Sequence, residues 1–344
     1  MTIKPNILLI YTGGTIGMMK DYASKALKAF DFSQILEKIP ELQQLNCQIQ
    51  NISFETPIDS SNMNTQFYLD IIEIIEKNYD FFDGFVVLSG SDTMSYTSSA
   101  ISFMFENLQK PIIFTGSQLP IGDLRTDAKE NLITSIEIAS AQKDGKPMIQ
   151  EVCLYFEYKL YRANRTTKMN AEQFEAFVSM NYPPLAESGV YLKFHEHYLQ
   201  RVSEENLPLI VRKKLVPDIV IIKIFPGITK NVLESILLIK NLKGVVLETF
   251  GSGNAPSENW FIDLIKQAIE KNIRIVNVTQ CLGGNVNQGH YETSIALKKI
   301  GVVSGKDITT EAAVAKLMYL LNDNFSLTEF TNHFETSLRG EISQ

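Results

Sequence analysis

The chain has 344 residues, which is long for one small core and suggests two domains. Its 44% hydrophobic and 21% charged residues are ordinary for a globular protein, and its net charge of −7 would repel nucleic acid and anionic membranes. We therefore expect no nucleic-acid and no membrane partner. No apolar run approaches the length of a membrane span and no leader pattern opens the chain, so we expect a cytoplasmic protein.

Short runs rich in valine and isoleucine alternate with longer stretches of helical periodicity. In the first part of the chain, strands are expected at 6–12, 84–89, 111–115 and 151–156, and helices at 65–79, 93–108 and 124–141. In the second part, strands are expected at 218–225, 244–250 and 272–279, and helices at 231–242, 260–271 and 310–321. This alternation predicts an α/β protein.

Helical periodicity is lost between the two parts. Tyr182-Pro-Pro-Leu-Ala-Glu-Ser-Gly189 is followed by a charged, irregular stretch up to Pro217. We expect a larger N-terminal domain at 1–189 with a doubly wound, mostly parallel sheet. A linker at 190–217 and a smaller, Rossmann-like C-terminal α/β domain at 218–344 would follow.

A glycine-rich turn, Thr12-Gly-Gly-Thr-Ile-Gly17, follows the first expected strand. Two glycines let the backbone turn tightly and approach a ligand, while Thr15 offers a hydroxyl at the turn. Nucleotide binding is the weaker alternative, because the turn lacks the Gly-Lys-Ser/Thr ending of a P-loop and the spacing of a dinucleotide fingerprint.

Two further segments supply an additional hydroxyl, a carboxylate and an amine. Ser89-Gly-Ser-Asp-Thr-Met94 follows the second expected strand and leads into a helix, so Ser91 or Asp92 could simply cap that helix. Helix amides at the same place could also stabilise an oxyanion. Lys168 ends Arg165-Thr-Thr-Lys168, and a lysine beside a carboxylate and a hydroxyl could move a proton. If each segment lies at the carboxyl end of a strand, the three form a nucleophilic hydrolase site.

These segments together resemble the bacterial-type L-asparaginase family, in particular its cytoplasmic type I branch. The likeness covers almost the whole chain. Further matching stretches are Asp59-Ser-Ser-Asn-Met63, Phe114-Thr-Gly-Ser-Gln-Leu-Pro120, Leu160-Tyr-Arg-Ala-Asn-Arg-Thr-Thr-Lys168, Gly251-Ser-Gly-Asn-Ala-Pro256 and Val278-Thr-Gln-Cys281.

The resemblance implies roles for particular residues. Thr15 would be the nucleophile, and Ser91, Asp92 and Lys168 would complete the catalytic group, with Asp92 also binding the substrate α-amino group. The substrate-binding residues would be Ser60, Ser61, Ser117 and Asn254, the last of these reaching the active site of a neighbouring subunit. The family implies no metal and no organic cofactor, and a homodimer or homotetramer.

The sequence departs from the family pattern at two places. The usual His-Gly-Thr-Asp-Thr is Ser89-Gly-Ser-Asp-Thr93 here, so Ser91 keeps the hydroxyl but loses the methyl group that restrains χ1. The family has a mobile lid with a tyrosine after Gly17, and Tyr22 is the candidate for that tyrosine here.

Cysteines and histidines give no sign of a metal site or a disulfide framework. The three cysteines are widely spaced, and His195, His197, His290 and His333 lack ligand spacing. Cys281, which ends an apolar strand, is expected to be a buried free thiol.

The function expected from the resemblance is hydrolysis of the side-chain amide of L-asparagine to L-aspartate and ammonia, through a threonine nucleophile and an acyl-enzyme. Two alternatives stay open at this point. The chain could be an asparaginase-like subunit of a tRNA-dependent amidotransferase, which uses the released ammonia in a complex. A non-catalytic amino-acid sensor would have lost the nucleophile, whereas Thr15 is present.

Overall fold

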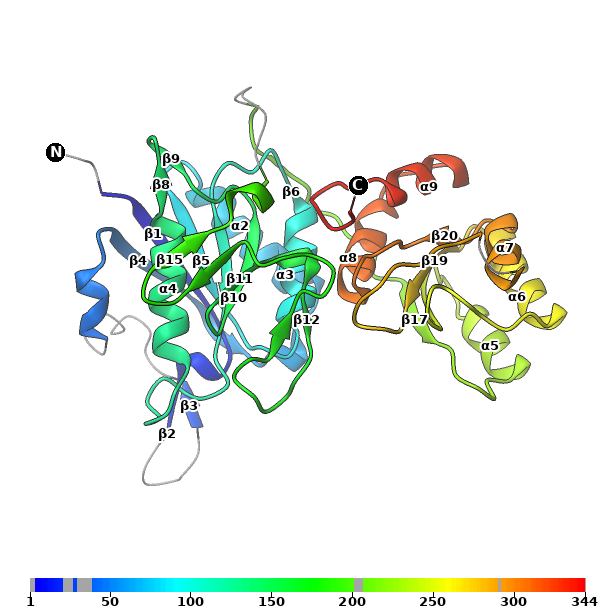
Figure 1. The fold of residues 1–344 in the computed structure, drawn as a ribbon, viewed down its shortest axis with the longest axis horizontal. Helices are drawn as coiled ribbons and strands as arrows, with labels where there is room; N and C mark the ends of the chain where they lie inside the picture. The colour runs from blue at the N-terminus through cyan, green and yellow to red at the C-terminus, as the bar shows by residue number, and fades with distance from the viewer. Residues whose placement is uncertain (1–3, 21–26, 30–38, 201–206, 290–291, 344) are drawn as a thin grey trace. The chain divides into compact units, whose positions relative to one another are not determined.

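The computed structural model of the protein describes residues 4–20, 27–29, 39–200, 207–289 and 292–343. The chain divides into two compact units, Met1–Arg212 (unit 1) and Lys213–Gln344 (unit 2), drawn in Figure 1. The division falls inside the range 190–217, and the first residues of that range belong to unit 1 as strand β15 (Leu192–Phe194). The expected limits of the domains and the linker stay a prediction.

Unit 1 is built on one eight-stranded sheet with the strand order β15-β14-β11-β10-β7-β5-β1-β4. Its parallel part consists of β10 (Val152–Phe156), β7 (Ile112–Thr115), β5 (Gly84–Leu88), β1 (Asn6–Gly13) and β4 (Gln48–Ile58). Antiparallel pairing continues the sheet through β11 (Lys159–Arg162), β14 (Ala186–Ser188) and β15. The prediction of a mostly parallel sheet is confirmed.

Strand β4 is the one long strand of this sheet that the sequence pattern does not indicate. It pairs in parallel with β1 at the edge of the sheet, with Gln48 opposite Asn6. Most of its residues are half-buried or exposed, and polar side chains occupy many of these positions. The valine- and isoleucine-rich run that marks the central, doubly covered strands is therefore missing from it.

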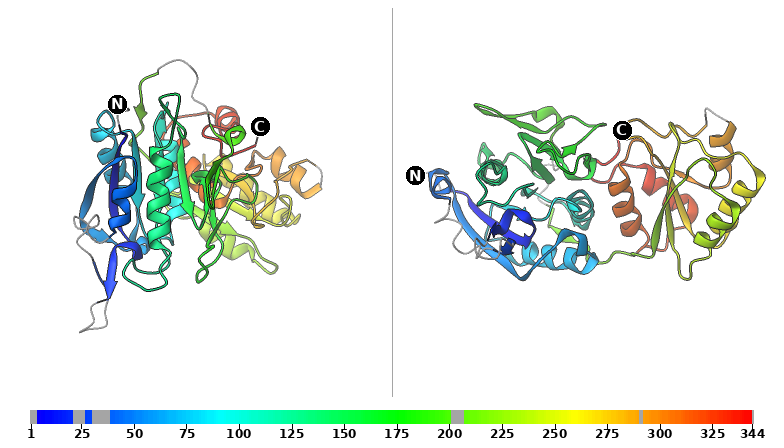
Figure 2. Two further views of the ribbon diagram at one scale, coloured as in Figure 1. Left: turned by 60° about the vertical axis from the view of Figure 1, so that its left-hand side comes forward. Right: turned by 90° about the horizontal axis from the view of Figure 1, so that it is seen from below.

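Helices cover both faces of the sheet (Figures 1 and 2). On one face, α4 (Ala128–Ser140) packs its Leu132 and Ile136 into the same core as Ile7 and Leu9 of β1. Because alternate strand residues point to opposite faces, the buried Leu8 and Ile10 lie on the other face. That face carries α2 (Thr65–Asn78) and α3 (Met94–Met104). The sheet is doubly wound, as expected.

Two helices of unit 1 are shorter than predicted. The expected helix 93–108 ends at Met104, where the chain becomes extended as β6 (Phe105–Glu106) and pairs with β16 (Ile210–Val211). The expected helix 124–141 begins only at Ala128, because residues 120–126 form turns in which the Asp123 amide donates to the Pro120 carbonyl oxygen and the Thr126 amide to that of Asp123.

Unit 2 is a smaller α/β unit. Its parallel sheet has the order β17-β18-β19-β20, formed by β17 (Ile219–Lys223), β18 (Gly244–Thr249), β19 (Arg274–Thr279) and β20 (Val303–Ser304). One core joins the sheet to α5 (Lys230–Leu237), α6 (Asn259–Glu270) and Leu297 of α7 (Glu292–Lys299). A second core joins it to α8 (Thr310–Leu320) and α9 (Leu327–Glu335). Helices on both sides give the predicted Rossmann-like layering.

The remaining elements are short. They are the strands β2 (Met18–Lys20), β3 (Leu27–Ala29), β8 (Gln142–Lys143), β9 (Lys146–Pro147), β12 (Thr167–Lys168) and β13 (Phe177–Val178), and the 3₁₀ helices η1 (Thr15–Gly17), η3 (Pro40–Gln44), η4 (Ser60–Asn62), η5 (Ala163–Arg165) and η6 (Glu196–Tyr198).

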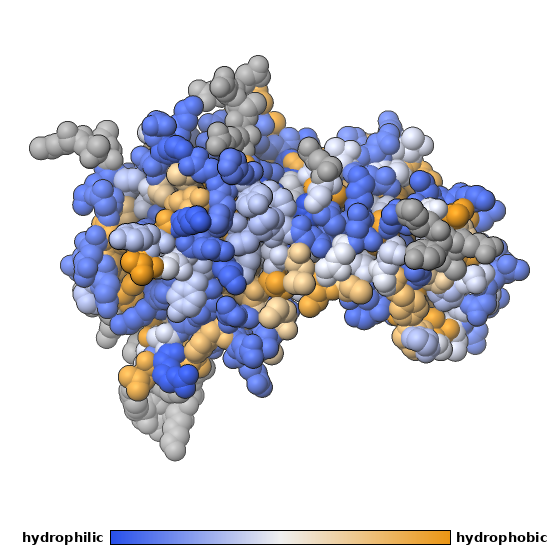
Figure 3. Space-filling view, viewed as in Figure 1, coloured by the Kyte–Doolittle hydropathy of each residue, from blue (hydrophilic) through white to orange (hydrophobic). Residues whose placement is uncertain are grey.

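Hydrophilic side chains cover most of the face seen in Figure 3, with smaller apolar areas between them. The most exposed large apolar residues of the described chain include Leu124, Val190 and Tyr191. Among the described helices, none combines the length and the apolar character needed to cross a membrane.

Candidate active site

The turn that carries Thr15 is packed directly against two other chain segments. Gly13 and Gly14 have φ values of 135° and 84°, in the region that favours glycine. A Cβ atom on Gly13 would lie 2.2 Å from the Ile58 carbonyl oxygen, and one on Gly14 would lie 2.3 Å from the Gly90 nitrogen. Since β1, β4 and β5 are parallel, the three segments that follow them meet at one edge of the sheet. The half-buried Thr15 lies at this meeting point.

The segment after β4 contains the predicted substrate-binding serines. Asp59 accepts hydrogen bonds from the Ser61 amide at 2.9 Å and from the Ser61 hydroxyl at 2.8 Å, and these bonds lower the pKa of Asp59. Ser60 is buried, and its carbonyl oxygen accepts a 2.9 Å hydrogen bond from the Thr93 hydroxyl. That bond ties the serine segment to the segment after β5.

Lys168, Ser91 and Asp92 form one hydrogen-bonded group. The Lys168 ammonium donates to Ser91 Oγ at 2.8 Å and to Asp92 Oδ1 at 2.7 Å. The lysine side chain is only 15% exposed, whereas that of Asp92 is 70% exposed. The Lys168 amine thus lies beside both the Ser91 hydroxyl and the solvent-exposed Asp92 carboxylate. The sequence alone could not establish that these groups are close together.

Helix capping does not account for these polar residues. Helix α3 begins at Met94, and its N-cap residue is Thr93, whose side chain makes no hydrogen bond to the helix amides. Ser91 and Asp92 precede the helix, in the turn that faces Lys168.

Lys168 reaches this place by a different route from the one expected. It does not follow the carboxyl end of β10, because β11 pairs antiparallel with β10 and leads the chain back to Arg162, opposite Cys153. From there the chain continues through η5 to β12, where Lys168 pairs with Phe177 of β13. The expectation that all three segments follow parallel strands is correct for two of them and wrong for the third.

Gln118 is a residue of this site that the sequence analysis did not single out. The Ser91 hydroxyl donates to Gln118 Oε1 at 3.4 Å, and Gln118 Nε2 donates to the Gln173 carbonyl oxygen at 2.9 Å. Its neighbour Ser117, predicted to bind substrate, is buried and donates its hydroxyl to the Leu119 carbonyl oxygen at 2.6 Å. The matching stretch 114–120 was the signal that could have drawn attention to Gln118.

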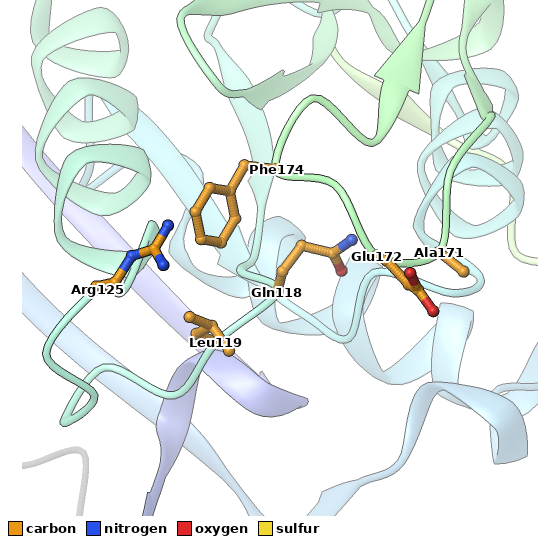
Figure 4. A pocket seen from close by; sticks show the side chains of 6 residues that line it. All are labelled: Gln118, Leu119, Arg125, Ala171, Glu172 and Phe174. Carbon is orange, nitrogen blue, oxygen red and sulfur yellow. The ribbon is translucent and has the colours of Figure 1, made fainter.

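A cavity of about 390 Å³ opens beside Gln118. Figure 4 shows the Gln118 side chain with Arg125 on one side and Glu172 on the other, and Phe174 above Leu119. The six lining residues are Gln118, Leu119, Arg125, Ala171, Glu172 and Phe174. The cavity therefore adjoins the Ser91 group through the Gln118 side chain.

The two remaining predicted site residues are Tyr22 and Asn254. Tyr22 lies outside the described residues. Asn254 belongs to unit 2, where it is half-buried in a tight turn and exchanges backbone hydrogen bonds with Phe250.

No group of histidine, cysteine, aspartate or glutamate side chains in the described chain is suited to hold a metal ion. Cys281 is exposed, so the prediction of a buried thiol is wrong. The reason is that β19 ends at Thr279, two residues earlier, and Cys281 lies in the turn that follows.

Fold and site together define an α/β protein with hydroxyl, amine and carboxylate groups near the carboxyl edge of a doubly wound sheet. Residues 6–200 match the family profile described as "Asparaginase, N-terminal", and residues 218–334 match "Glutaminase/Asparaginase C-terminal domain". The chain belongs to the asparaginase family, so the predicted resemblance is confirmed.

Individual relatives match over most or nearly all of their length. L-asparaginase 1 of Escherichia coli strain K12 is 38% identical over 99% of this chain and 98% of its own. The crystal structure of L-asparaginase I from Vibrio cholerae O1 biovar eltor is 39% identical, covers 99% of this chain and 100% of its own, and superposes with a TM-score of 0.89. One subunit of the Glutamyl-tRNA(Gln) amidotransferase from Pyrococcus abyssi is 31% identical, and the match covers 98% of this chain and 77% of that protein.

Proposed function

We propose that the protein is an amidohydrolase that converts L-asparagine to L-aspartate and ammonia. The observation that carries this proposal is the group in which Lys168 Nζ donates to both Ser91 and Asp92, next to the contact between Gly14 and Gly90 that brings the Thr15 turn alongside. The names of the E. coli and V. cholerae relatives agree with the same activity.

In the proposed reaction, the Thr15 hydroxyl oxygen attacks the side-chain amide carbon and its proton leaves through the Ser91–Lys168 group. The tetrahedral intermediate then expels ammonia, which carries away a proton, and an ester on Thr15 remains. Water attacks that ester, releases aspartate and returns the proton to Thr15. The backbone N–H of Ser91 and a water molecule are the proposed donors to the oxyanion.

The directions of the hydrogen bonds in this group are those expected of the enzyme without bound substrate. Lys168 donates to Ser91, and Ser91 in turn donates to Gln118, so its proton points away from the lysine. Accepting a proton would require Lys168 to lose one first and Ser91 to rotate. A neutral lysine beside a hydroxyl that can rotate is able to relay a proton in either direction.

Substrate recognition is proposed to use the opposite charges of the amino acid. The 70% exposed Asp92 carboxylate would bind the α-ammonium group, and Ser60 and Ser61 would bind the α-carboxylate, with Ser117 contributing to the same pocket. The Ser61 hydroxyl already donates to Asp59, so the backbone around Ser61 is held in place before substrate binds.

An active dimer or tetramer is part of this proposal, because the family resemblance assigns Asn254 to the site of a neighbouring subunit. Sedimentation should give a multiple of 38.8 kDa. Mixing Lys168→Ala chains with Asn254→Ala chains should restore activity, since some sites would then hold both intact residues. A fully active monomer would contradict the shared site without affecting Thr15, Ser91, Asp92 or Lys168. A cytoplasmic location remains the expectation.

The decisive experiment measures ammonia release from L-asparagine and L-glutamine by wild type and by Thr15→Ala, with circular dichroism to show that both are folded. We expect the variant to lose several orders of magnitude in kcat. Thr328→Ala, at an exposed threonine of α9, serves as the control and should keep wild-type activity. A folded Thr15→Ala variant with more than about a tenth of the wild-type kcat, a loss below ~1.4 kcal/mol in the barrier, would rule out Thr15 as nucleophile.

The same assay separates the second candidate, a protein that supplies ammonia to a tRNA-dependent amidotransferase. The P. abyssi amidotransferase relative makes this alternative concrete. An enzyme that acts alone should release ammonia without tRNA or a partner protein. If the protein alone releases no ammonia and gains activity only with tRNA and an amidotransferase partner, the alternative is favoured. If it releases no ammonia but binds asparagine, a sensor is favoured.

A further inference from the structure

The segment between β11 and Lys168 lies along helix α3, running towards its first turn. Asn164 Nδ2 donates to Ser102 Oγ at 3.1 Å, and Ser99 Oγ donates to the Ala163 carbonyl oxygen at 3.4 Å. One turn nearer the start of the helix, Thr166 Oγ1 lies 3.4 Å from Ser95 Oγ in a hydrogen bond. Lys168 then meets Ser91 at 2.8 Å. Ser95, Ser99 and Ser102 follow one another at intervals of four and three residues, so they share one face of the helix.

Helix α3 carries more serine than helix stability would favour. Its sequence, Met-Ser-Tyr-Thr-Ser-Ser-Ala-Ile-Ser-Phe-Met, has four serines in 11 residues. Serine is a poorer helix former than alanine, because its hydroxyl competes for backbone hydrogen bonds. All four serines are buried, and an alanine at these positions would have no polar group to remove from water. The hydroxyls of Ser95, Ser99 and Ser102 are used for contacts with the segment 163–166.

Both ends of this segment are fixed independently. At its start, Arg162 Nε donates to Glu151 Oε2 at 2.6 Å in a pair whose side chains are at most 5% exposed. At its end, the Thr166 hydroxyl closes a turn by donating to the Ala163 carbonyl oxygen at 2.7 Å. A slip by one residue along α3 would leave buried hydroxyl and amide groups without partners, so the contacts specify one register.

We propose that Ser95, Ser99 and Ser102 of α3 are positioning residues for Lys168, which hold its amine against Ser91 and Asp92. None of the three belongs to the group formed by Thr15, Ser91, Asp92 and Lys168. They act through the backbone of 163–166, which determines where the lysine side chain begins. The inference rests on the proposed function for its kinetic readout, but the placement of the lysine can be measured without any turnover.

The test compares Ser102→Ala and the triple variant Ser99→Ala, Ser102→Ala, Thr166→Val with a matched control, Ser98→Ala. Ser98 is on the same helix and fully buried, and its hydroxyl has no hydrogen-bond partner in the described part of the chain. Thermal unfolding verifies that each variant is folded. We expect kcat to fall about tenfold for Ser102→Ala and further for the triple variant, with KM within twofold. Ser98→Ala should match wild type in both.

A conservative replacement provides the second kinetic test. Thr166→Ser keeps the hydroxyl that bonds the Ala163 carbonyl oxygen and Ser95, so it should retain at least half of the wild-type kcat. Thr166→Val keeps the shape and removes the hydroxyl, so it should lose about tenfold. A role in packing alone would give the opposite order, because valine fills the space of the threonine better than serine does.

Reductive methylation followed by peptide mass spectrometry gives the readout that does not depend on turnover. The Lys168 side chain is 15% exposed and hydrogen-bonded, whereas Lys77, which is 71% exposed, serves as the internal reference. Relative to Lys77, Lys168 should be modified at least fivefold faster in Ser102→Ala than in wild type, and at the wild-type rate in Ser98→Ala.

The two readouts separate the two proposals. Suppose that wild type releases no ammonia but that Lys168 is still methylated faster in Ser102→Ala than in wild type. The proposed function then fails and the positioning role stands. Unchanged kcat and unchanged methylation in the folded triple variant would overturn the positioning role. If the triple variant does not fold, Ser102→Ala and the Thr166 pair decide the question by the same criteria.

Discussion

Gly14 and Gly90 touch through their backbones: a Cβ atom on Gly14 would lie 2.3 Å from the Gly90 nitrogen and 2.5 Å from its Cα atom. No side chain fits between the turn that carries Thr15 and the turn that precedes Ser91. The proposed nucleophile and the lysine group are therefore neighbours because two glycines follow two adjacent strands.

The first prediction concerns Gly14→Ala. Gly14 has a φ of 84°, so alanine would suffer both backbone strain and a collision with Gly90. We expect a loss of at least about 2 kcal/mol in the free energy of unfolding. The fraction of activity lost should be larger than the fraction of stability lost. Gly145→Ala is the matched control, because Gly145 has a φ of 76° and nothing within 4 Å of a Cβ atom. It should lose only about 1 kcal/mol in urea denaturation. Equal losses for the two variants would refute the collision.

Ser91 gives a second prediction. Ser91→Thr restores the residue usual in the family and keeps the hydroxyl within reach of Lys168 and Gln118, so activity should be preserved or improved. Ser91→Ala removes the hydroxyl and should lower kcat by about 100-fold or more. Steady-state ammonia release measures both. A fully active Ser91→Ala would show that Lys168 does not work through Ser91.

Glu157 makes the stability depend on pH. Burial, with repulsion from Asp127, Glu130 and Glu175, raises the pKa of Glu157 to about 7 from 4.5. The folded state therefore holds a proton that the unfolded chain has lost, so this contribution to stability is full below pH 4.5 and is lost as the pH rises through 7.

The corresponding measurement compares wild type with Glu157→Gln, which keeps the size of the side chain without its charge. Urea unfolding should show the variant close to wild type at pH 5 and more stable by about 1–3 kcal/mol at pH 8. Glu270→Gln, whose parent side chain is 62% exposed on α6, should show no such difference between the two pH values. A variant that is no more stable than wild type at pH 8 would contradict the raised pKa.

The buried pair of Lys316 and Glu341 gives the last prediction, for unit 2. Both side chains are fully buried, and Lys316 also donates to the carbonyl oxygens of Phe334 at 2.7 Å and Thr336 at 2.6 Å. Lys316→Met should cost about 3–5 kcal/mol, because it leaves a carboxylate and two carbonyls without their cation. Lys77→Met breaks the exposed pair with Glu73 and should cost less than about 1 kcal/mol. Similar melting temperatures for the two variants would contradict this ranking.

The sequence could predict the central strands because their valine- and isoleucine-rich runs are buried on both faces. Thr15 and Ser91 could be placed for the same reason, since each follows such a strand. The edge strand β4 could not, because its polar residues alternate with half-buried ones. The route of Lys168 could not be predicted either, since it depends on the antiparallel turn of β11 and on serine contacts with α3.

Other parts of the site lie beyond what local pattern can reveal. Gln118 contacts Ser91 across 27 residues of sequence, and nothing in a single chain signals that pairing apart from the family resemblance. The role of Asn254 requires a second copy of the chain, and Tyr22 lies outside the described residues, so both stay predictions.

The separation of Lys168 from its partners also bears on how the protein becomes active. Its bonds to Ser91 and Asp92 span 77 and 76 residues, and the segment that carries it can settle only after α3, β10 and β11 have assembled. Contacts of such range form late, because the intervening loop must be closed first. The appearance of catalysis during refolding should therefore lag behind the recovery of helical signal, so enzymatic turnover reports a late step of folding.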